Sequence, residues 1–202
     1  MSDGFFPGTE MPDAGWWEAL WPDPARVLAE SGLQAGMRAV DLCAGTGWFT
    51  LPMARIARDV VAVDIDDALL EIARRRIADA GLGNCAFLAA DAYALATAVA
   101  APVDFVFLAN AFHGVPDRPR LSASVASVLR PGGQFAIVNW HRRPRERTTV
   151  LGAPRGPKTE LRMSPDATIA DVASSGLRPV QVVEIPPYHY AAVFAKIDAP
   201  TG

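Results

Sequence analysis

The sequence predicts an α/β fold, a doubly wound and mostly parallel sheet with helices on both faces. Three observations lead to this prediction. Strand-like and helix-like segments alternate between residues 38 and 140. The segments 60–64 and 103–109 are almost entirely apolar, which is typical of parallel strands that are buried on both faces. The segment 67–80 is amphipathic and has the length of a helix that covers such a sheet.

The composition limits the classes of protein to which the chain can belong. Its 202 residues, half of them apolar, suffice for one domain with its own core, and its net charge of −3 offers no general attraction to nucleic acid. The apolar runs are too short to span a membrane, and no signal peptide is recognisable. Cys43 and Cys85 form no zinc-binding pair. We therefore expect a cytoplasmic protein without a nucleic-acid or membrane partner; the preference for Arg over Lys fits a GC-rich bacterial genome.

Residues 1–35 predict a helical cover made of two short helices. Asp13 can cap the first helix, and Pro22 ends it. Asp23 caps the second helix, Pro24 takes its first position, and Gly32 ends it. The side chains that the first helix offers for packing are Trp16, Trp17, Leu20 and Trp21.

Residues 36–140 predict the core of the domain. The expected strands are 38–42, 60–64, 85–90, 103–109 and 134–140, and the expected helices are 48–57, 67–80 and 121–129. In the helix 67–80 we expect Leu70, Ile72, Ala73 and Ile77 to face inward and the three arginines at 74–76 to face solvent.

The chain after residue 140 is less regular. Residues 141–163 are rich in Arg, Pro and Gly and predict an irregular basic loop. Residues 164–202 predict a helix, to about residue 175, and two strands, 180–185 and 191–196. These strands are close enough in sequence for a hairpin, so we expect the last strand to run antiparallel.

A glycine-containing turn at 40–47 is the most informative motif. Gly45 and Gly47 follow a strand and open a helix, and Asp64 ends the next strand, where a carboxylate can accept both hydroxyls of a ribose. Thr50 stands where a dinucleotide site has its third glycine, and no phosphate-binding Gly-Lys-Ser/Thr is present. The motif therefore favours a ligand that contains adenosine but no phosphate.

With these residues the sequence resembles the class I S-adenosylmethionine-dependent methyltransferases. The run 41–47 is similar to the first motif of that family, although Cys43 replaces its usual first glycine. Asp64 matches the acid that holds the ribose, and the pair Asp-Ala at 91–92 matches the residues that read the adenine amine. The turn Leu-Arg-Pro-Gly-Gly at 129–133 resembles the turn before the fifth strand of the family.

The resemblance implies a fold, a cofactor and a reaction. The implied sheet has seven strands in the order 3-2-1-4-5-7-6, with strand 7 antiparallel. The cofactor would be S-adenosylmethionine, and its methyl group would pass to a small-molecule acceptor by in-line displacement, leaving S-adenosylhomocysteine. No Pro-Pro-Tyr follows Asn110, which disfavours planar amines of bases or glutamine as acceptors. The residues assigned to the cofactor are Asp41, Cys43, Ala44, Gly45, Thr46, Gly47, Asp64, Ile65, Asp91, Ala92 and Asn110.

Three histidines are candidates for the acceptor side. His113, His141 and His189 each follow or border a strand at the edge where ligands bind in such sheets. We hypothesise that two or three of them share one pocket, where one of them, with His113 as first choice, acts as a general base. A metal bound by the imidazoles and purely structural hydrogen bonding are the alternatives.

Aromatic residues and arginines provide the remaining acceptor candidates. Trp17 and Trp21 lie one helical turn apart, which predicts either core packing or, for Trp17 with Phe5 and Phe6, the wall of a lid. Tyr188 is a further candidate contact. In the loop 141–163, cationic residues exceed acidic ones, so either a solvated loop or a clamp for an anionic acceptor is expected. The charged residues of this loop are Arg142, Arg143, Arg145, Glu146, Arg147, Arg155, Lys158, Glu160 and Arg162, with Arg143 as the candidate contact.

Two other functions compete with methyl transfer. One is a non-catalytic protein that binds S-adenosylmethionine or S-adenosylhomocysteine. The other is a nicotinamide-dependent oxidoreductase, which the missing third glycine and the absence of a Tyr-x-x-x-Lys pair disfavour. The oligomeric state and the methylated atom stay open.

Overall fold

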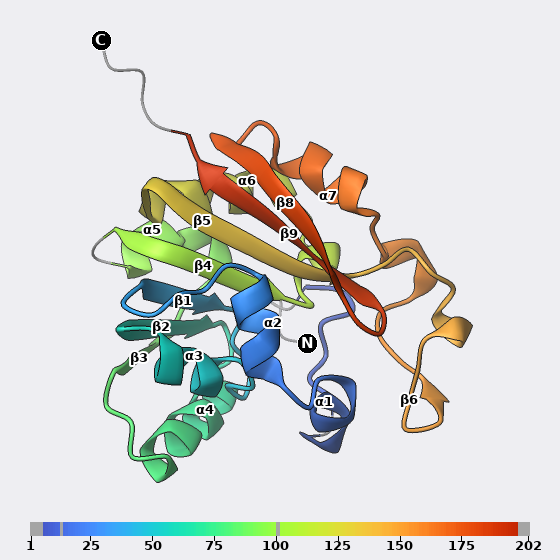
Figure 1. Ribbon diagram of the computed structural model, residues 1–202, viewed down its shortest axis with the longest axis horizontal. Helices are drawn as coiled ribbons and strands as arrows, with labels where there is room; N and C mark the ends of the chain where they lie inside the picture. Colours follow the sequence, from blue (N-terminus) through green and yellow to red (C-terminus); the bar gives the residue numbers. More distant parts are fainter. Residues whose placement is uncertain (1–5, 13, 100–101, 198–202) are drawn as a thin grey trace.

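The computed structural model describes residues 6–12, 14–99 and 102–197. A seven-stranded sheet in the order β3-β2-β1-β4-β5-β9-β8 runs through the molecule (Figure 1). In this sheet, β8 and β9 take the places of the expected strands 6 and 7, so the expected strand order is confirmed. Only β9 runs antiparallel to both of its neighbours, which confirms the antiparallel last strand. The strands are β1 Arg38–Leu42, β2 Asp59–Asp64, β3 Cys85–Ala89, β4 Val103–Ala109, β5 Leu129–Trp140, β8 Leu177–Ile185 and β9 His189–Lys196.

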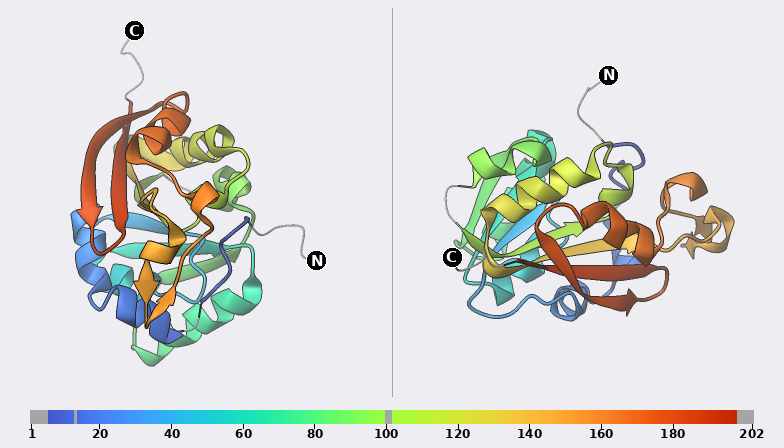
Figure 2. Two further views of the ribbon diagram at one scale, coloured as in Figure 1. Left: turned by 90° about the vertical axis from the view of Figure 1, so that its right-hand side faces the viewer. Right: turned by 90° about the horizontal axis from the view of Figure 1, so that it is seen from above.

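Helices cover both faces of the sheet, as expected (Figure 2). Alternate residues of one strand face opposite layers: Ala39 packs with α2 and α3, whereas Val40 packs with α5 and α6. None of the helices that the structure describes is long and apolar enough to cross a membrane. The helices on the first face are α1 Ala14–Leu20, α2 Pro24–Glu30, α3 Thr50–Ile56 and α4 Asp67–Asp79, and those on the second are α5 Leu95–Ala98, α6 Arg118–Val128 and α7 Pro165–Val172.

Side-chain caps define where the helices begin. Oδ1 of Asp23 accepts a hydrogen bond from the backbone N–H of Arg26, as the sequence predicts. Oδ1 of Asp117 does the same for Arg120, so α6 begins three residues before its expected start. The expected cap Asp13 lies outside the described residues.

One inward-facing prediction for α4 is wrong. Ile72 is 44% exposed, whereas Leu70, Ala73 and Ile77 are buried. Positions 70, 73 and 77 form one stripe at helical spacing, and position 72 lies about 100° away from position 73 around the axis. Arg76 also departs from expectation, because its Nη1 donates a hydrogen bond to the carbonyl of Thr46 at 3.1 Å.

The segment 141–163 is a small folded unit and not the irregular loop that we expected. It contains two short antiparallel strands, β6 Thr149–Val150 and β7 Ala153–Pro154, between the turns η3 Arg145–Arg147 and η4 Thr159–Leu161. Val150 is buried in the cluster that contains the tryptophans of α1. The unit thus projects from the end of β5 and lies beside α1 (Figure 1).

Candidate active site

The turn after β1 brings a backbone N–H group to the end of β2. The N–H of Gly45 donates a hydrogen bond to Oδ2 of Asp64 at 2.8 Å. Gly45 and Gly47 have φ of +54° and +78°, and Cys43, at the position where the family has glycine, has φ of +59°. This left-handed backbone favours glycine, so Cys43 is held in a conformation that its side chain disfavours.

Two other motif residues, Asp41 and Gly47, support this turn by their contacts with α3 and α4. Asp41 is buried, and its Oδ2 accepts a hydrogen bond from the hydroxyl of Thr50 at 2.6 Å. Burial raises the pKa of Asp41 to about 7. A Cβ on Gly47 would lie 2.8 Å from Cβ of Ala73, so the glycine allows α4 to approach the turn.

Asp64 is held by two backbone donors. Besides the contact with Gly45, its Oδ1 accepts a hydrogen bond from the N–H of Asp66 at 3.0 Å. Burial raises the pKa of Asp64, and the backbone hydrogen bonds oppose that shift. Each carboxylate oxygen has two acceptor lone pairs, so both oxygens can still accept a ligand hydroxyl. The carboxylate is therefore fixed in position and able to hold a ribose.

Asn110 directly follows β4 and has an unusual backbone conformation and a side chain that is unpaired within the described part of the chain. Its φ is +56°, and neither polar atom of its side-chain amide has a hydrogen-bond partner among the described residues, although both are buried. A buried amide left unpaired costs about 1–3 kcal/mol. Asn110 lines the large cavity, so a polar ligand group there would relieve this cost.

These elements border one large cavity of about 1270 Å³. Seven of the eleven residues assigned to the cofactor line it, whereas Asp41, Ala44, Thr46 and Gly47 are absent from its lining. Ligand pockets usually measure about 300–1000 Å³, so there is room for a cofactor and an acceptor together. The seven lining residues are Cys43, Gly45, Asp64, Ile65, Asp91, Ala92 and Asn110.

Comparisons with known proteins show what the chain is similar to. The model of a family described as "Methyltransferase domain" matches residues 39–133. The ubiquinone/menaquinone biosynthesis C-methyltransferase UbiE of Marinomonas sp. (strain MWYL1) is 30% identical over 131 residues, which are 63% of this chain and 51% of the relative. Residues 39–133 thus match a methyltransferase domain, in agreement with the resemblance that the sequence motifs indicate. The chain spans about half the length of the curated relatives that it matches.

Several solved structures share the fold of this chain. A SAM-dependent methyltransferase from Aquifex aeolicus superimposes with a TM-score of 0.76 at 24% identity, covering 92% of this chain and 94% of the other. The N-methyltransferase NodS of Bradyrhizobium japonicum in complex with S-adenosyl-L-homocysteine gives 0.67 at 16% identity, with coverage of 88% and 87%. The solved structures confirm the expected fold, and the match to a methyltransferase domain supports S-adenosylmethionine as the cofactor.

His113 is the one histidine of the three that lines the cavity. It is buried, its Nε2 lies 3.1 Å from the carbonyl oxygen of Gly8, and its Nδ1 lies 3.2 Å from Oδ1 of Asn139. Both oxygens are acceptors, so a neutral imidazole can donate to only one of them at a time. Burial lowers the pKa of His113, which keeps the ring neutral near pH 7.

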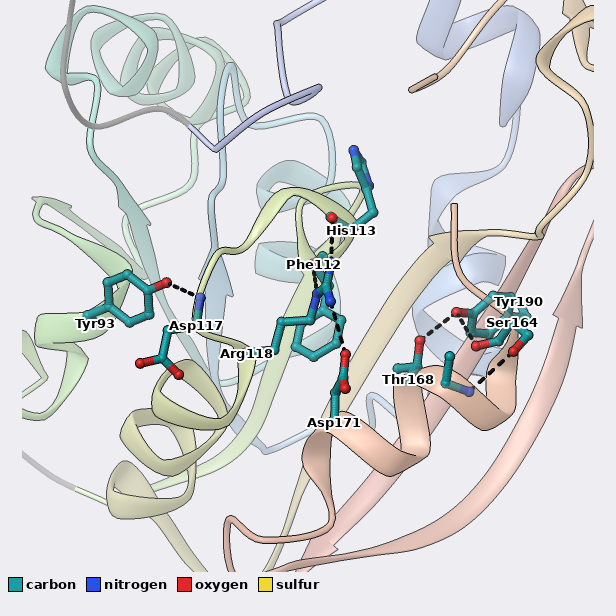
Figure 3. Close-up of polar contacts among 10 residues, drawn as sticks. Tyr93, Phe112, His113, Asp117, Arg118, Ser164, Thr168, Asp171 and Tyr190 are labelled. Atoms are coloured by element: carbon teal, nitrogen blue, oxygen red, sulfur yellow. Dashed lines mark hydrogen bonds and ion pairs between the residues drawn. The ribbon is translucent and has the colours of Figure 1, made fainter. Parts of the chain in front are cut away.

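Arg118 fixes the backbone that carries His113. Its guanidinium donates hydrogen bonds to the carbonyl oxygens of Phe112, at 3.0 Å, and His113, at 2.8 Å (Figure 3). The same group pairs with Asp171 on α7 at 3.1 Å. The turn that presents His113 is therefore tied to α6 and α7.

The expectation that the histidines share a pocket is wrong. His189 is buried between Trp140 and Trp21, with ring centroids at 4.1 and 4.6 Å, and lies outside the cavity lining. His141 also lies outside it, where its Nε2 is 2.9 Å from Oε2 of Glu184. His189 and Tyr190 are successive residues of β9 and face opposite sides of the sheet, so His189 packs against Trp140 whereas His141 packs near Tyr190.

Three further acceptor candidates also lie outside the cavity lining. Trp21 is buried against Trp17 and Phe49 and serves the core. Tyr188 donates its hydroxyl hydrogen to the carbonyl of Thr149 and so fastens β6. Arg143 is exposed to solvent. Each side chain follows the direction that its helix, hairpin or turn gives it, which the pattern of residue types does not reveal.

Other residues replace them at the cavity. Trp17 lines it, as predicted for the wall, together with Trp16 and Trp140, which we did not predict. The segment 6–12 also lines it, with Sδ of Met11 only 3.1 Å from where a Cβ of Gly45 would lie. Phe6 belongs to this segment, whereas Phe5 lies outside the described residues. The sequence could have indicated Trp140 as a cavity residue, because it ends an apolar strand at the edge of the sheet where ligands bind.

Proposed function

We propose that this protein transfers the methyl group of S-adenosylmethionine to a small-molecule acceptor held in the same cavity. One observation carries the proposal. The cavity continues from Asp64, past Asn110, to His113 and the aromatic wall of Trp16 and Trp140. Cofactor and acceptor would therefore lie side by side without an intervening barrier, as an in-line displacement requires.

The bound cofactor would supply a methyl group activated by a sulfonium. The chain would mainly position the reactants, which can contribute several kcal/mol, up to about 7–11, to lowering the barrier. Asp64 would accept hydrogen bonds from the ribose hydroxyls, and Asn110 would offer its amide to a polar group of the cofactor. Trp16, Trp17 and Trp140 would exclude water from the acceptor.

His113 is our candidate for the general base. In the described structure its Nε2 lies 3.1 Å from the carbonyl oxygen of Gly8 in the N-terminal segment. His113 could therefore take a proton from an acceptor through Nε2 only after that segment moves away and in the tautomer that leaves Nε2 unprotonated. Full activity of His113→Ala at saturating acceptor would exclude it as the base.

The curated relatives offer one acceptor class to test. They are named as C-methyltransferases of ubiquinone and menaquinone biosynthesis. The indole rings of Trp16, Trp17 and Trp140 on the cavity wall suit a planar aromatic ring. We therefore include ring carbons of phenolic compounds among the acceptors to be screened, next to oxygen, nitrogen and sulfur nucleophiles.

The first experiment is calorimetric titration of the purified protein with S-adenosylmethionine and, separately, with NADH. We expect binding of the first ligand alone and its loss in Asp64→Ala. Binding of NADH instead would overturn the proposal in favour of an oxidoreductase. If the cofactor binds but an acceptor screen gives no S-adenosylhomocysteine, the alternative of a non-catalytic binding protein gains support.

A further inference from the structure

Three guanidinium groups gather where the segment 141–163 meets the cavity. They belong to Arg145, Arg155 and Arg162, and none of them has a carboxylate within ion-pair distance in the part of the chain that the structure describes. The ion pairs found among the described residues involve other side chains. The cluster is therefore a concentration of positive charge that the chain itself leaves uncompensated.

Arg162 forms the buried base of this cluster. Only 3% of it is exposed, and its guanidinium lies 4.8 Å from the centre of a Trp140 ring. It donates hydrogen bonds to neutral oxygens only: the carbonyls of Pro157 and Arg155, and the hydroxyl of Thr148. Burial and the nearby charge of Arg145 lower the pKa of Arg162 to about 10, so it stays charged at neutral pH.

Arg145 and Arg155 line the cavity directly. Both are half-buried. Nε of Arg145 donates to the carbonyl of Gly156 at 3.0 Å, whereas Nε of Arg155 is buried without a hydrogen-bond partner among the described residues. The bond from Nη2 of Arg162 to the carbonyl of Arg155, at 2.8 Å, fixes the backbone from which the Arg155 side chain extends.

The cluster lies at the acceptor end of the cavity. A Cβ on Gly156 would lie 2.6 Å from the Trp140 ring, so the segment packs directly on that wall. A Cβ on Gly8 would lie 3.3 Å from both Nε2 of His113 and Cβ of Pro157, which places the segment beside His113 as well. Asp64 ends β2, which β1 and β4 separate from β5 in the sheet.

The charges along the cavity are therefore separated. The cofactor end carries Asp64, Asp66 and Asp91, and the acceptor end carries Arg145, Arg155 and Lys158. Two exposed carboxylates, Glu10 and Glu160, also line the cavity, but neither is within ion-pair distance of the described cations.

A ligand oxyanion would satisfy this arrangement. Half-buried guanidinium groups lose hydration, and a neutral carbonyl compensates them less well than a negative group does. The planar fork of an arginine matches the two oxygens of a carboxylate or phosphate, and such charge-assisted bonds are about twice as strong as neutral ones.

We infer that the acceptor carries a carboxylate or phosphate group, which Arg155 and Arg145 bind at the end of the cavity next to His113 and Trp140. The inference rests on the proposed function, in which the other end of the cavity holds S-adenosylmethionine. Arg162 is a positioning residue in this site, because it holds the backbone of Arg155 and touches no ligand.

The test measures binding of three aromatic probes of similar size. Protein saturated with S-adenosylhomocysteine is titrated calorimetrically with benzoate, phenyl phosphate and neutral benzamide. The variants are Arg155→Gln and, as the matched control, Arg142→Gln, which removes an exposed arginine of the same segment outside the cavity lining. The backbone contacts of Arg155 stay possible in its variant, and the affinity for S-adenosylhomocysteine reports whether each variant is folded.

We expect benzoate or phenyl phosphate to bind at least tenfold more tightly than benzamide, and Arg155→Gln to abolish that preference while Arg142→Gln keeps it. If benzoate binds more tightly than phenyl phosphate, the acceptor carries a carboxylate; if phenyl phosphate binds more tightly, it carries a phosphate. Equal affinity for the anions and benzamide, or equal losses in both variants, would overturn the inference. Failure of S-adenosylhomocysteine to bind would instead contradict the proposed function, and the anion titrations are then read on the free protein.

Discussion

The carboxylate of Asp64 and the backbone N–H of Gly45, 19 positions apart in the sequence, form a 2.8 Å hydrogen bond that joins the ends of β2 and β1 at the cavity. This bond orients the carboxylate before any ligand arrives. The same carboxylate has a raised pKa because it is largely buried. Its ability to accept hydroxyl hydrogens therefore depends on pH in the acid range.

We expect Asp64→Asn to weaken the binding of S-adenosylmethionine at least tenfold, because its amide nitrogen cannot accept a hydroxyl hydrogen. In the wild type, affinity should fall as pH drops towards the raised pKa of Asp64, since the protonated carboxyl loses acceptor capacity. Calorimetry between pH 7.5 and 4.5 measures both effects. Asp59→Asn, at the other end of β2, is the control and should bind like the wild type. If the affinity of Asp64→Asn for S-adenosylmethionine falls at low pH as in the wild type, another group causes that pH dependence.

Gly47→Ala should destabilise the protein more than Gly81→Ala does. Both glycines have positive φ, at +78° and +70°, so each alanine carries a backbone cost of about 1–2 kcal/mol. Only at Gly47 would the new Cβ meet another residue, Ala73, at 2.8 Å, whereas the space at Gly81 is open. Overpacking of this kind adds about 1–3 kcal/mol. Urea unfolding of both variants tests the difference, and equal losses would show that α4 moves aside without cost.

His189→Phe should flatten the acid dependence of stability. Burial places the pKa of His189 well below its ordinary value, so below about pH 6.5 the unfolded chain takes up a proton that the folded chain does not. The free energy of unfolding of the wild type therefore falls as pH decreases, by up to about 1.4 kcal/mol per pH unit from this group. Phenylalanine fits between Trp140 and Trp21 and cannot be protonated.

Urea unfolding at pH 7.5 and 5.5 measures this effect. His113, whose pKa is also lowered, contributes to both proteins and cancels in the comparison. The wild type should lose about 1 kcal/mol more than His189→Phe over this range. Parallel losses in the two proteins would refute the assignment.

Arg118→Met should loosen the turn that carries His113. The substitution removes the hydrogen bonds to the carbonyls of Phe112 and His113 and the pair with Asp171, and we expect a loss of about 1–3 kcal/mol in stability. Arg120→Met is the control, because Arg120 lies in the same helix as Arg118 and its guanidinium only stacks on the ring of Tyr93, 4.6 Å from the ring centre. Thermal unfolding and the imidazole NMR signals of His113 are the two measurements. If both variants leave those signals unchanged, Arg118 does not position His113.

The local patterns of the sequence determined most of the fold and the cofactor end of the site. Apolar runs such as 103–109 predict buried strands because burial on both faces leaves no room for polar residues. The turn with Gly45 and the acid Asp64 could be located because a tight turn and a ribose contact require particular residue types at the ends of adjacent strands.

Only the tertiary structure determined which side chains line the acceptor end of the cavity. His113, His141 and His189 all border the same sheet edge, yet His141 packs near Tyr190, His189 packs against Trp140, and only His113, in the turn after β4, reaches the cavity. The cavity role of Arg155 and the exposure of Arg143 depend on how the segment 141–163 folds on Trp140. Residue type determines what a side chain can bind, but contacts between distant segments determine which side chains meet.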